Sequence, residues 1–227
     1  MWVNQSLKMK YLKILCLLIA MTHFAAITTA QESINTEVFK SSFKPTATGG
    51  DICYNGKKHS FRLRAGGKKI TLAAPKGQQD NQMYLQIDGV PFQASLVPLP
   101  QQMLGSVRLE NLTYQQQREI LEGYVKYEID YLENELKMKL SNMRKEWVYI
   151  NNRLYYIWRF EANYGSVSSQ VVKPVVAQVY YSTVCFNQVL DLNRPVFKGD
   201  DVNKVKGQID KIATTLRLYS TAKPPQI

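Results

Sequence analysis

Apolar and polar residues alternate over several short stretches of this chain, which is the pattern of half-buried β-strands. The clearest stretch surrounds Asp88-Gly89, a dipeptide that favours a type I′ turn because both central positions need positive φ. A two-residue turn at this dipeptide places Leu85 opposite Phe92, and one face of the hairpin is then entirely apolar. Asn151-Asn152 predicts a further hairpin on the same reasoning, with Trp158 on its inward face.

Two segments between the predicted strands carry apolar residues at helical spacing instead. The first helix is expected to begin after Thr113, which forms a capping-box pair with Gln116, and to end near Lys137. The second is expected to start at residues 200–201, with an apolar stripe of Val202, Val205, Ile209, Ile212, Leu216 and Tyr219. Residues 174–190 are rich in β-forming residues and are interpreted as one long central strand.

The order of strands, helix, strands and helix predicts an α+β domain. We expect an antiparallel sheet of hairpins with a central and a C-terminal helix packed on it. This order resembles the PsbP-like fold, and residues 59–74 and 113–219 carry the resemblance. The resemblance implies an α/β/α sandwich of the kind that mostly serves as an accessory or binding module, and it implies no activity. Residues 145–151 and 184–190 also look like stretches of small uncharacterised exported bacterial proteins.

The first thirty residues have the pattern of a secretory signal peptide. Lys8, Lys10 and Lys13 precede an apolar run over residues 14–27, and small residues follow as far as Ala30. A bilayer-spanning helix needs about 20 apolar residues, so the short run favours a cleaved signal over an uncleaved anchor. We therefore expect a periplasmic or secreted protein with no integral membrane span after cleavage.

The remaining chain divides into three parts by composition. Residues 31–50 are polar and are interpreted as a flexible lead-in. Residues 51–220 form the predicted single α+β domain, and residues 221–227 form a tail. A domain of this length is large enough to bury a hydrophobic core of its own.

Charge is the strongest indication of a partner. The chain has 29 basic and 18 acidic residues, and three of the basic residues are lysines of the signal peptide, which leaves the mature chain at +8. A net positive charge favours contact with polyanions. The expected partner of the exported protein is an envelope protein or an acidic polysaccharide rather than nucleic acid, and its identity stays open.

A basic ribbon between Asp51 and Asp80 is the first candidate binding surface, formed by Lys57, Lys58, Arg62, Arg64, Lys68 and Lys69. If the chain turns at Ala65-Gly66-Gly67, the side chains of Arg62, Arg64 and Lys69 point outward and offer an anion-binding face. The alternative interpretation is a strand edge that charge protects from aggregation.

The second candidate surface is the outer face of the hairpin around Asn151-Asn152, with Arg153, Tyr155 and Arg159. Arginines that alternate with aromatic residues can bind sugars or bases by stacking and forked hydrogen bonds. The same face can instead lie under a helix, with its arginines reaching solvent. Both interpretations stay open.

The sequence offers few residues for catalysis. His59 is the one histidine left after signal removal, and we expect it to be structural. The sequence lacks the cysteine and histidine spacings of common metal sites and the glycine-rich loop of phosphate sites, so neither metal nor cofactor is expected. The helix acids Glu128, Asp130, Glu133 and Glu135 are interpreted as solvated.

The sequence thus favours a non-enzymatic binding or interaction module over an exported polyanion binder. A hydrolase with scattered carboxylates is the weakest alternative. Cys53 and Cys185 remain after processing, and export permits a disulfide between them, although each can equally pack as a small apolar residue.

Overall fold

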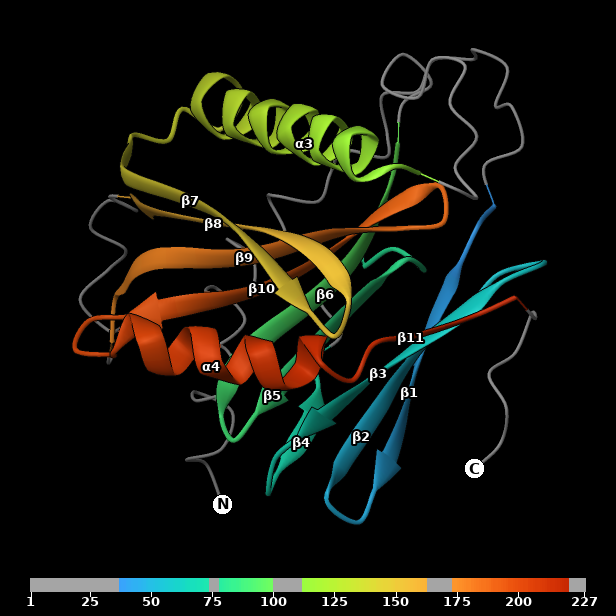
Figure 1. The fold of residues 1–227 in the computed structure, drawn as a ribbon. Coiled ribbons are helices and arrows are strands. Elements are labelled where there is room, and N and C mark those ends of the chain that lie inside the picture. The colour runs from blue at the N-terminus through green and yellow to red at the C-terminus, as the bar shows by residue number, and fades with distance from the viewer. Residues whose placement is uncertain (1–36, 74–77, 100–111, 163–172, 221–227) are drawn as a thin grey trace, which may run out of the picture.

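The computed structural model describes residues 37–73, 78–99, 112–162 and 173–220, and within these residues the chain forms two antiparallel sheets and two helices (Figure 1). The smaller sheet has the strand order β1-β2-β3-β11, and the larger sheet has the order β4-β5-β6-β10-β9-β8-β7. The strands of the smaller sheet are β1 (Lys40–Thr46), β2 (Gly49–Asn55), β3 (Ser60–Gly66) and β11 (Arg217–Tyr219).

The larger sheet carries the helices on its two faces. Its strands are β4 (Ile70–Leu72), β5 (Gln82–Ile87), β6 (Val90–Pro98), β7 (Leu140–Ile150), β8 (Arg153–Ala162), β9 (Val175–Cys185) and β10 (Gln188–Phe197). Helix α3 (Tyr114–Asn134) packs on β8 and β9 from one side. Helix α4 (Val202–Ala213) packs on β9 and β10 from the other side and also touches β3.

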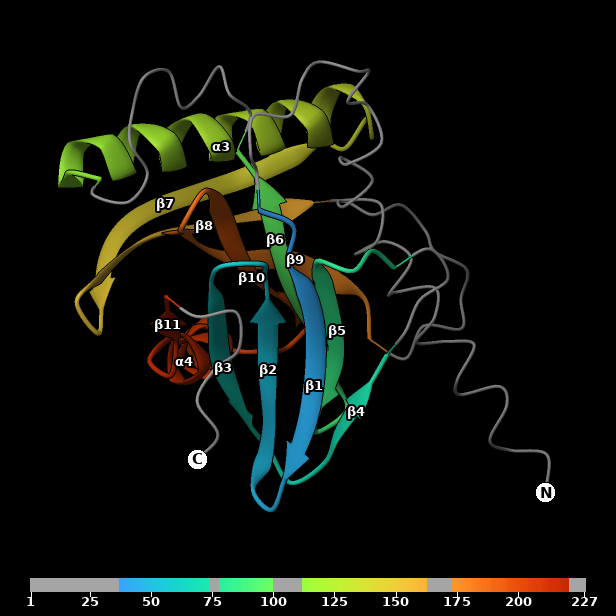
Figure 2. The ribbon, with the colours of Figure 1, turned by 90° about the vertical axis from the view of Figure 1, so that its right-hand side faces the viewer.

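The layers follow from this packing. Figure 2 shows α3 above the larger sheet, and α4 with the smaller sheet below it. One hydrophobic core lies between the larger sheet, α4 and the smaller sheet, and a second lies under α3. The α+β class and the placement of helices on opposite sheet faces are as predicted.

The predicted registers of two hairpins are confirmed. Leu85 pairs with Phe92 across β5 and β6, and the turn residue Asp88 has a φ of 52°. Ile150 pairs with Arg153 across β7 and β8, so the turn between these strands has two residues, as predicted. Both turns use positive φ angles, which Asp, Asn and Gly adopt at low cost.

Helix α3 begins as its sequence predicts. The hydroxyl of Thr113 accepts a hydrogen bond from the backbone N–H of Gln116, and the side chain of Gln116 accepts one from the backbone N–H of Thr113. The helix ends at Asn134, a little before the predicted end at Lys137. Lys137 has a φ of 54°, and this left-handed conformation takes the chain out of the helix.

The prediction of one long strand over residues 174–190 is wrong. The chain turns at Phe186 and Asn187, so that Cys185 pairs with Gln188 and two strands, β9 and β10, replace one. Both strands are buried over nearly their whole length. A strand buried on both faces gives a continuous apolar run in the sequence. A turn without glycine or proline is hard to recognise within such a run.

The C-terminal helix is shorter than its apolar stripe suggests. It begins after the predicted cap Asp201 but ends at Ala213. Leu216 is buried in the turn that follows, and Tyr219 belongs to β11, which pairs with β3. Apolar positions of the turn and the strand continue the helical spacing, so periodicity alone cannot locate the end.

The domain begins earlier than predicted. Residues 40–46 of the expected lead-in form β1, which pairs with β2, and Phe39 is buried in the main core. A polar edge strand lacks a sustained apolar pattern, which explains the error. The signal over residues 1–30 and the tail over residues 221–227 lie outside the described residues. Neither described helix combines the length and the apolar character that a bilayer span requires.

Candidate functional site

The predicted basic ribbon does not form one surface. Strand β3 pairs with β2 and β11 in the smaller sheet, whereas β4 pairs with β5 in the larger one, so the hairpin expected at Ala65-Gly66-Gly67 is wrong. Lys69 precedes β4 and donates its backbone N–H to the Asp88 carboxylate at 2.8 Å. Strand β3 uses both of its edges to pair with β2 and β11, so no edge remains for β4.

Arg62 and Arg64 flank an acid rather than an open anion site. The Nε of Arg64 donates to Oδ1 of Asp51 at 2.9 Å, and Nη1 of Arg62 lies 3.9 Å from Oδ2 of the same residue. The side chain of Arg62 is 15% exposed and that of Asp51 is 11% exposed. Asp51 therefore neutralises the outer face of β3 locally, from the neighbouring strand β2.

The second predicted surface is also interrupted. Tyr155 is fully buried in the core that contains α4, and its hydroxyl lies 3.4 Å from the carbonyl oxygen of Ala213. Arg153 donates to the carbonyl oxygen of Val184 at 3.0 Å. The interpretation that this face lies under a helix is thus the correct one, and of its three predicted residues only Arg159 remains as part of a described cleft.

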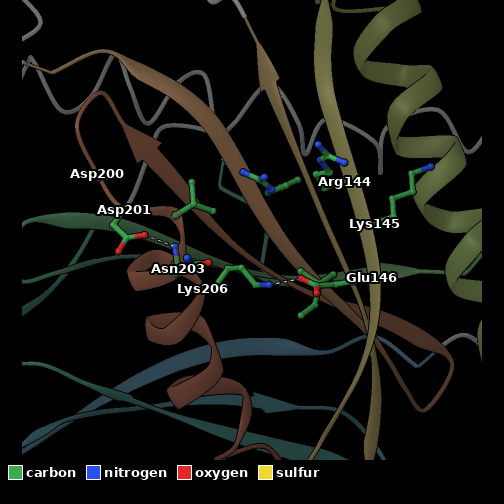
Figure 3. A pocket seen from close by; sticks show the side chains of 10 residues that line it. Arg144, Lys145, Glu146, Asp200, Asp201, Asn203 and Lys206 are labelled. Carbon is green, nitrogen blue, oxygen red and sulfur yellow. Dashed lines mark hydrogen bonds and ion pairs between the residues drawn. The ribbon is translucent and has the colours of Figure 1, made fainter.

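This cleft lies between the β7–β8 hairpin and the start of α4, and it has a volume of about 620 Å³ (Figure 3). The hairpin contributes Arg144, Glu146 and Arg159, and the opposite wall contributes Asp200, Asp201 and Lys206. Lys206 forms an ion pair with Glu146, which ties α4 to β7 across the cleft. Figure 3 shows this contact between the two walls.

The most unusual feature of the cleft is a pair of cross-strand arginines. Arg144 on β7 lies directly opposite Arg159 on β8, and both side chains line the cleft. We call these two residues the arginine pair. Like charges directly opposite one another destabilise a sheet. Within the described ranges, no carboxylate forms an ion pair with either arginine. The arginine pair is thus a concentration of unneutralised positive charge.

The acids on the opposite wall already have partners. Asp201 caps α4 by accepting the backbone N–H of Asn203 at 2.8 Å. Asp200 accepts the backbone N–H of Phe197 at 3.2 Å and lies 3.8 Å from Nζ of Lys173. These contacts support the interpretation of the two acids as structural. Within the described part of the chain, no three acidic, histidine or cysteine residues gather in the manner of a metal site.

His59 has structural partners. Its Nδ1 lies 2.6 Å from Oε2 of Glu37, and its ring stacks on Phe186 with 4.1 Å between centroids. Burial acts to raise the pKa of Glu37, but the N–H groups of Lys58 and His59 outweigh it, and that pKa is lowered overall. Glu37 thereby orders the loop that joins β2 to β3, and this loop contains His59.

The two cysteines are free thiols in the structure, so the disulfide alternative is not realised. Cys53 is half-buried on the face of β2 that carries Asp51, whereas its neighbours Ile52 and Tyr54 point into the core. Cys185 lies within that core. The two sulfurs therefore lie on opposite faces of the smaller sheet, which excludes a bond between them.

Two carboxylic acids are buried although the sequence did not predict it. Glu128 on α3, interpreted above as solvated, is 7% exposed, and Asp191 on β10 is also 7% exposed. Burial and the neighbouring Asp191 raise the pKa of Glu128 to about 8. Glu128 lies at the same helical spacing as the apolar residues Val125 and Leu132. This spacing was the sign in the sequence that its side chain is buried. The described cleft does not include either acid.

Comparisons with known proteins bear on the fold alone. No family model matches the chain, and no curated protein sequence matches it. The chain is similar to the solution structure of cyanobacterial PsbP (CyanoP) from Synechocystis sp. PCC 6803, with 11% sequence identity and a TM-score of 0.46. The match covers 85% of this chain and 99% of that chain. This is a weak similarity of overall topology.

Proposed function

We propose that this protein is an exported, non-enzymatic binding module that holds an acidic polysaccharide at the arginine pair. The observation that supports the proposal is the cross-strand placement of Arg144 and Arg159 at the wall of a cleft, where neither forms an ion pair with a carboxylate of the described residues. A guanidinium group presents several N–H donors in one plane, which suits the two oxygens of a carboxylate or sulfate.

The position of the cleft favours an extended ligand. Strand β7 is the outermost strand of the larger sheet, so the arginine pair lies at the rim of the molecule. A linear polyanion can follow such a rim, and the mature charge of +8 would attract it from a distance.

Binding to heparin, used as a model acidic polysaccharide, tests the proposal. Changing both Arg144 and Arg159 to Gln should weaken binding by at least about tenfold, because each lost charged hydrogen bond is worth about 1.5–3 kcal/mol. The affinity of the unchanged protein should fall with added salt. The measurement is a titration of the mature protein with heparin. The intact mass of that protein should correspond to a chain that starts at Gln31.

The matched control removes two charges elsewhere. Lys57 and Lys68 are exposed members of the predicted basic ribbon and do not line the cleft. The Lys57→Gln/Lys68→Gln variant should bind heparin nearly as well as the unchanged protein. An equal loss of affinity in both double variants would mean that net charge alone governs binding, and the cleft would then not be the site.

A further inference from the structure

Two buried carboxylic acids lie close together between α3 and the larger sheet. Glu128 is on the buried side of α3 with Leu121, Val125 and Leu132. Asp191 is on β10, and it is one of the groups that raise the pKa of Glu128. We call these two residues the acid pair. It lies on the sheet face opposite α4 and is separate from the cleft proposed above.

Hydrogen bonds attach one member of the acid pair to the sheet. The hydroxyl of Ser182 on β9 donates to Oδ1 of Asp191 at 2.5 Å. The indole Nε1 of Trp158 on β8 donates to the oxygen of Ser182 at 3.0 Å. Asp191 on β10 is therefore attached directly to β9 and, through Ser182, to β8, whereas Glu128 belongs to the helix.

The described residues around the acid pair supply no compensating positive charge. The titratable groups facing the acid pair are tyrosines, with Tyr124, Tyr127 and Tyr131 on α3 and Tyr180 on β9. Among the described residues, no lysine, arginine or histidine contributes to the shifted pKa of either acid. Burial raises the pKa of Asp191 to about 7, although the Ser182 hydrogen bond opposes the shift.

We propose that the acid pair is a proton-dependent switch that holds α3 on the sheet when protonated and loosens the helix when it ionises. Two neighbouring carboxylates that are buried without a compensating cation repel one another and lose their hydration. When α3 moves away from the sheet, water hydrates both carboxylates again. The helix, rather than the sheet, is the part that yields, because it packs mainly on β8 and β9 whereas Asp191 is held within the sheet.

The direction of the pH dependence follows from the two states. With α3 lifted, both acids have ordinary pKa values near 4.5 and 3.8, and with α3 in place these values are raised to about 8 and about 7. The closed state therefore binds more protons, and opening is favoured as the pH rises. The effect begins near pH 4, where the acids of the open state ionise, and it is complete only above about pH 9, where both acids are ionised in either state.

Amide hydrogen exchange of the mature protein, measured from pH 5 to pH 9 and corrected for intrinsic exchange, tests this proposal. The opening equilibrium of α3 should rise by at least about a hundredfold between pH 5 and pH 8, since each bound proton contributes up to about tenfold per pH unit. Amides of α4 should remain at least about tenfold better protected than those of α3 at pH 8, because α4 opens only with larger parts of the structure.

Neutral substitutions provide the decisive comparison. The Glu128→Gln/Asp191→Asn variant imitates the protonated acid pair, so α3 should stay protected at every pH. The single variant Glu128→Gln keeps only the contribution of Asp191, so its opening equilibrium should depend less steeply on pH and should level off above about pH 7. Glu133→Gln alters an exposed glutamate of the same helix and should behave like the unchanged protein.

Two results would overturn the proposal. One is an α3 opening equilibrium whose pH dependence persists in the folded double variant, since other groups would then be responsible. The other is an equal loss of protection in α3 and α4 at every pH, which would describe unfolding of the whole domain.

Discussion

Tyr155 and Trp158 show how each face of β8 is used. Trp158 is 1% exposed and faces α3, where its ring stacks on that of Tyr180 at 4.1 Å. Tyr155 is 0% exposed and belongs to the core on the α4 side. Because both side chains are fully enclosed, replacing either by alanine should leave a cavity and cost about 3–5 kcal/mol of unfolding free energy.

Chemical denaturation of the two variants measures these costs, and Tyr149→Ala is the control. Tyr149, on β7, is 61% exposed, so its replacement should cost less than about 1 kcal/mol. If Tyr155→Ala proved as mild as Tyr149→Ala, the face beneath α4 would be open, and the predicted Arg153–Arg159 surface would have to be reconsidered.

At the scale of elements, the start of α3 depends on its cap. The first turn of this helix has no acidic residue and the last turn no basic one, so the helix dipole is not compensated by charge at either end. The reciprocal bonds of Thr113 and Gln116 satisfy two of the free N–H groups instead. Thr113→Ala should therefore cost about 1 kcal/mol of unfolding free energy, measured by urea denaturation.

The conservative variant Thr113→Ser supplies the comparison, because its hydroxyl can accept the same hydrogen bond from Gln116. It should keep most of the stability that Thr113→Ala loses. A loss in Thr113→Ser as large as that in Thr113→Ala would show that the methyl group of Thr113, rather than its hydroxyl, supports the helix.

At the scale of the whole molecule, side-chain packing rather than a disulfide bond holds the two sheets together. Cys185 is buried, which raises the pKa of its thiol to about 11, and burial together with Asp51 raises that of Cys53. Thiols with raised pKa react slowly. The thermal midpoint of the mature protein should not change when a reductant is added, and both thiols should be alkylated once the chain is unfolded without reductant.

A fall in the thermal midpoint on addition of the reductant, or the absence of alkylation in the unfolded chain, would establish a disulfide between Cys53 and Cys185. Such a bond closes a long loop and would contribute about 2–5 kcal/mol. It would also require β2 to turn over, since Cys53 and Cys185 lie on opposite faces of the smaller sheet in the structure.

Patterns confined to neighbouring residues were enough to predict much of the fold and part of the candidate site. The Asp88-Gly89 and Asn151-Asn152 turns, the Thr113 cap and the burial of Trp158 followed from turn chemistry, capping and alternation, all of which act over a few residues. Arg159 was among the candidate residues, whereas Arg144, which lies opposite it in the sheet, was not. The two arginines meet only through the register of β7 and β8.

The sequence by itself determined the α+β class, the two helices and the hairpins, because local conformational preference and apolar spacing decide these features. The tertiary structure alone decided which strand edges met, and that choice separated β3 from β4, placed Asp51 between Arg62 and Arg64, and enclosed Tyr155 beneath α4. It also brought Glu128 and Asp191 together from positions far apart in the chain. Burial and the neighbours of a charge depend on contacts between distant segments, and no local pattern contains them.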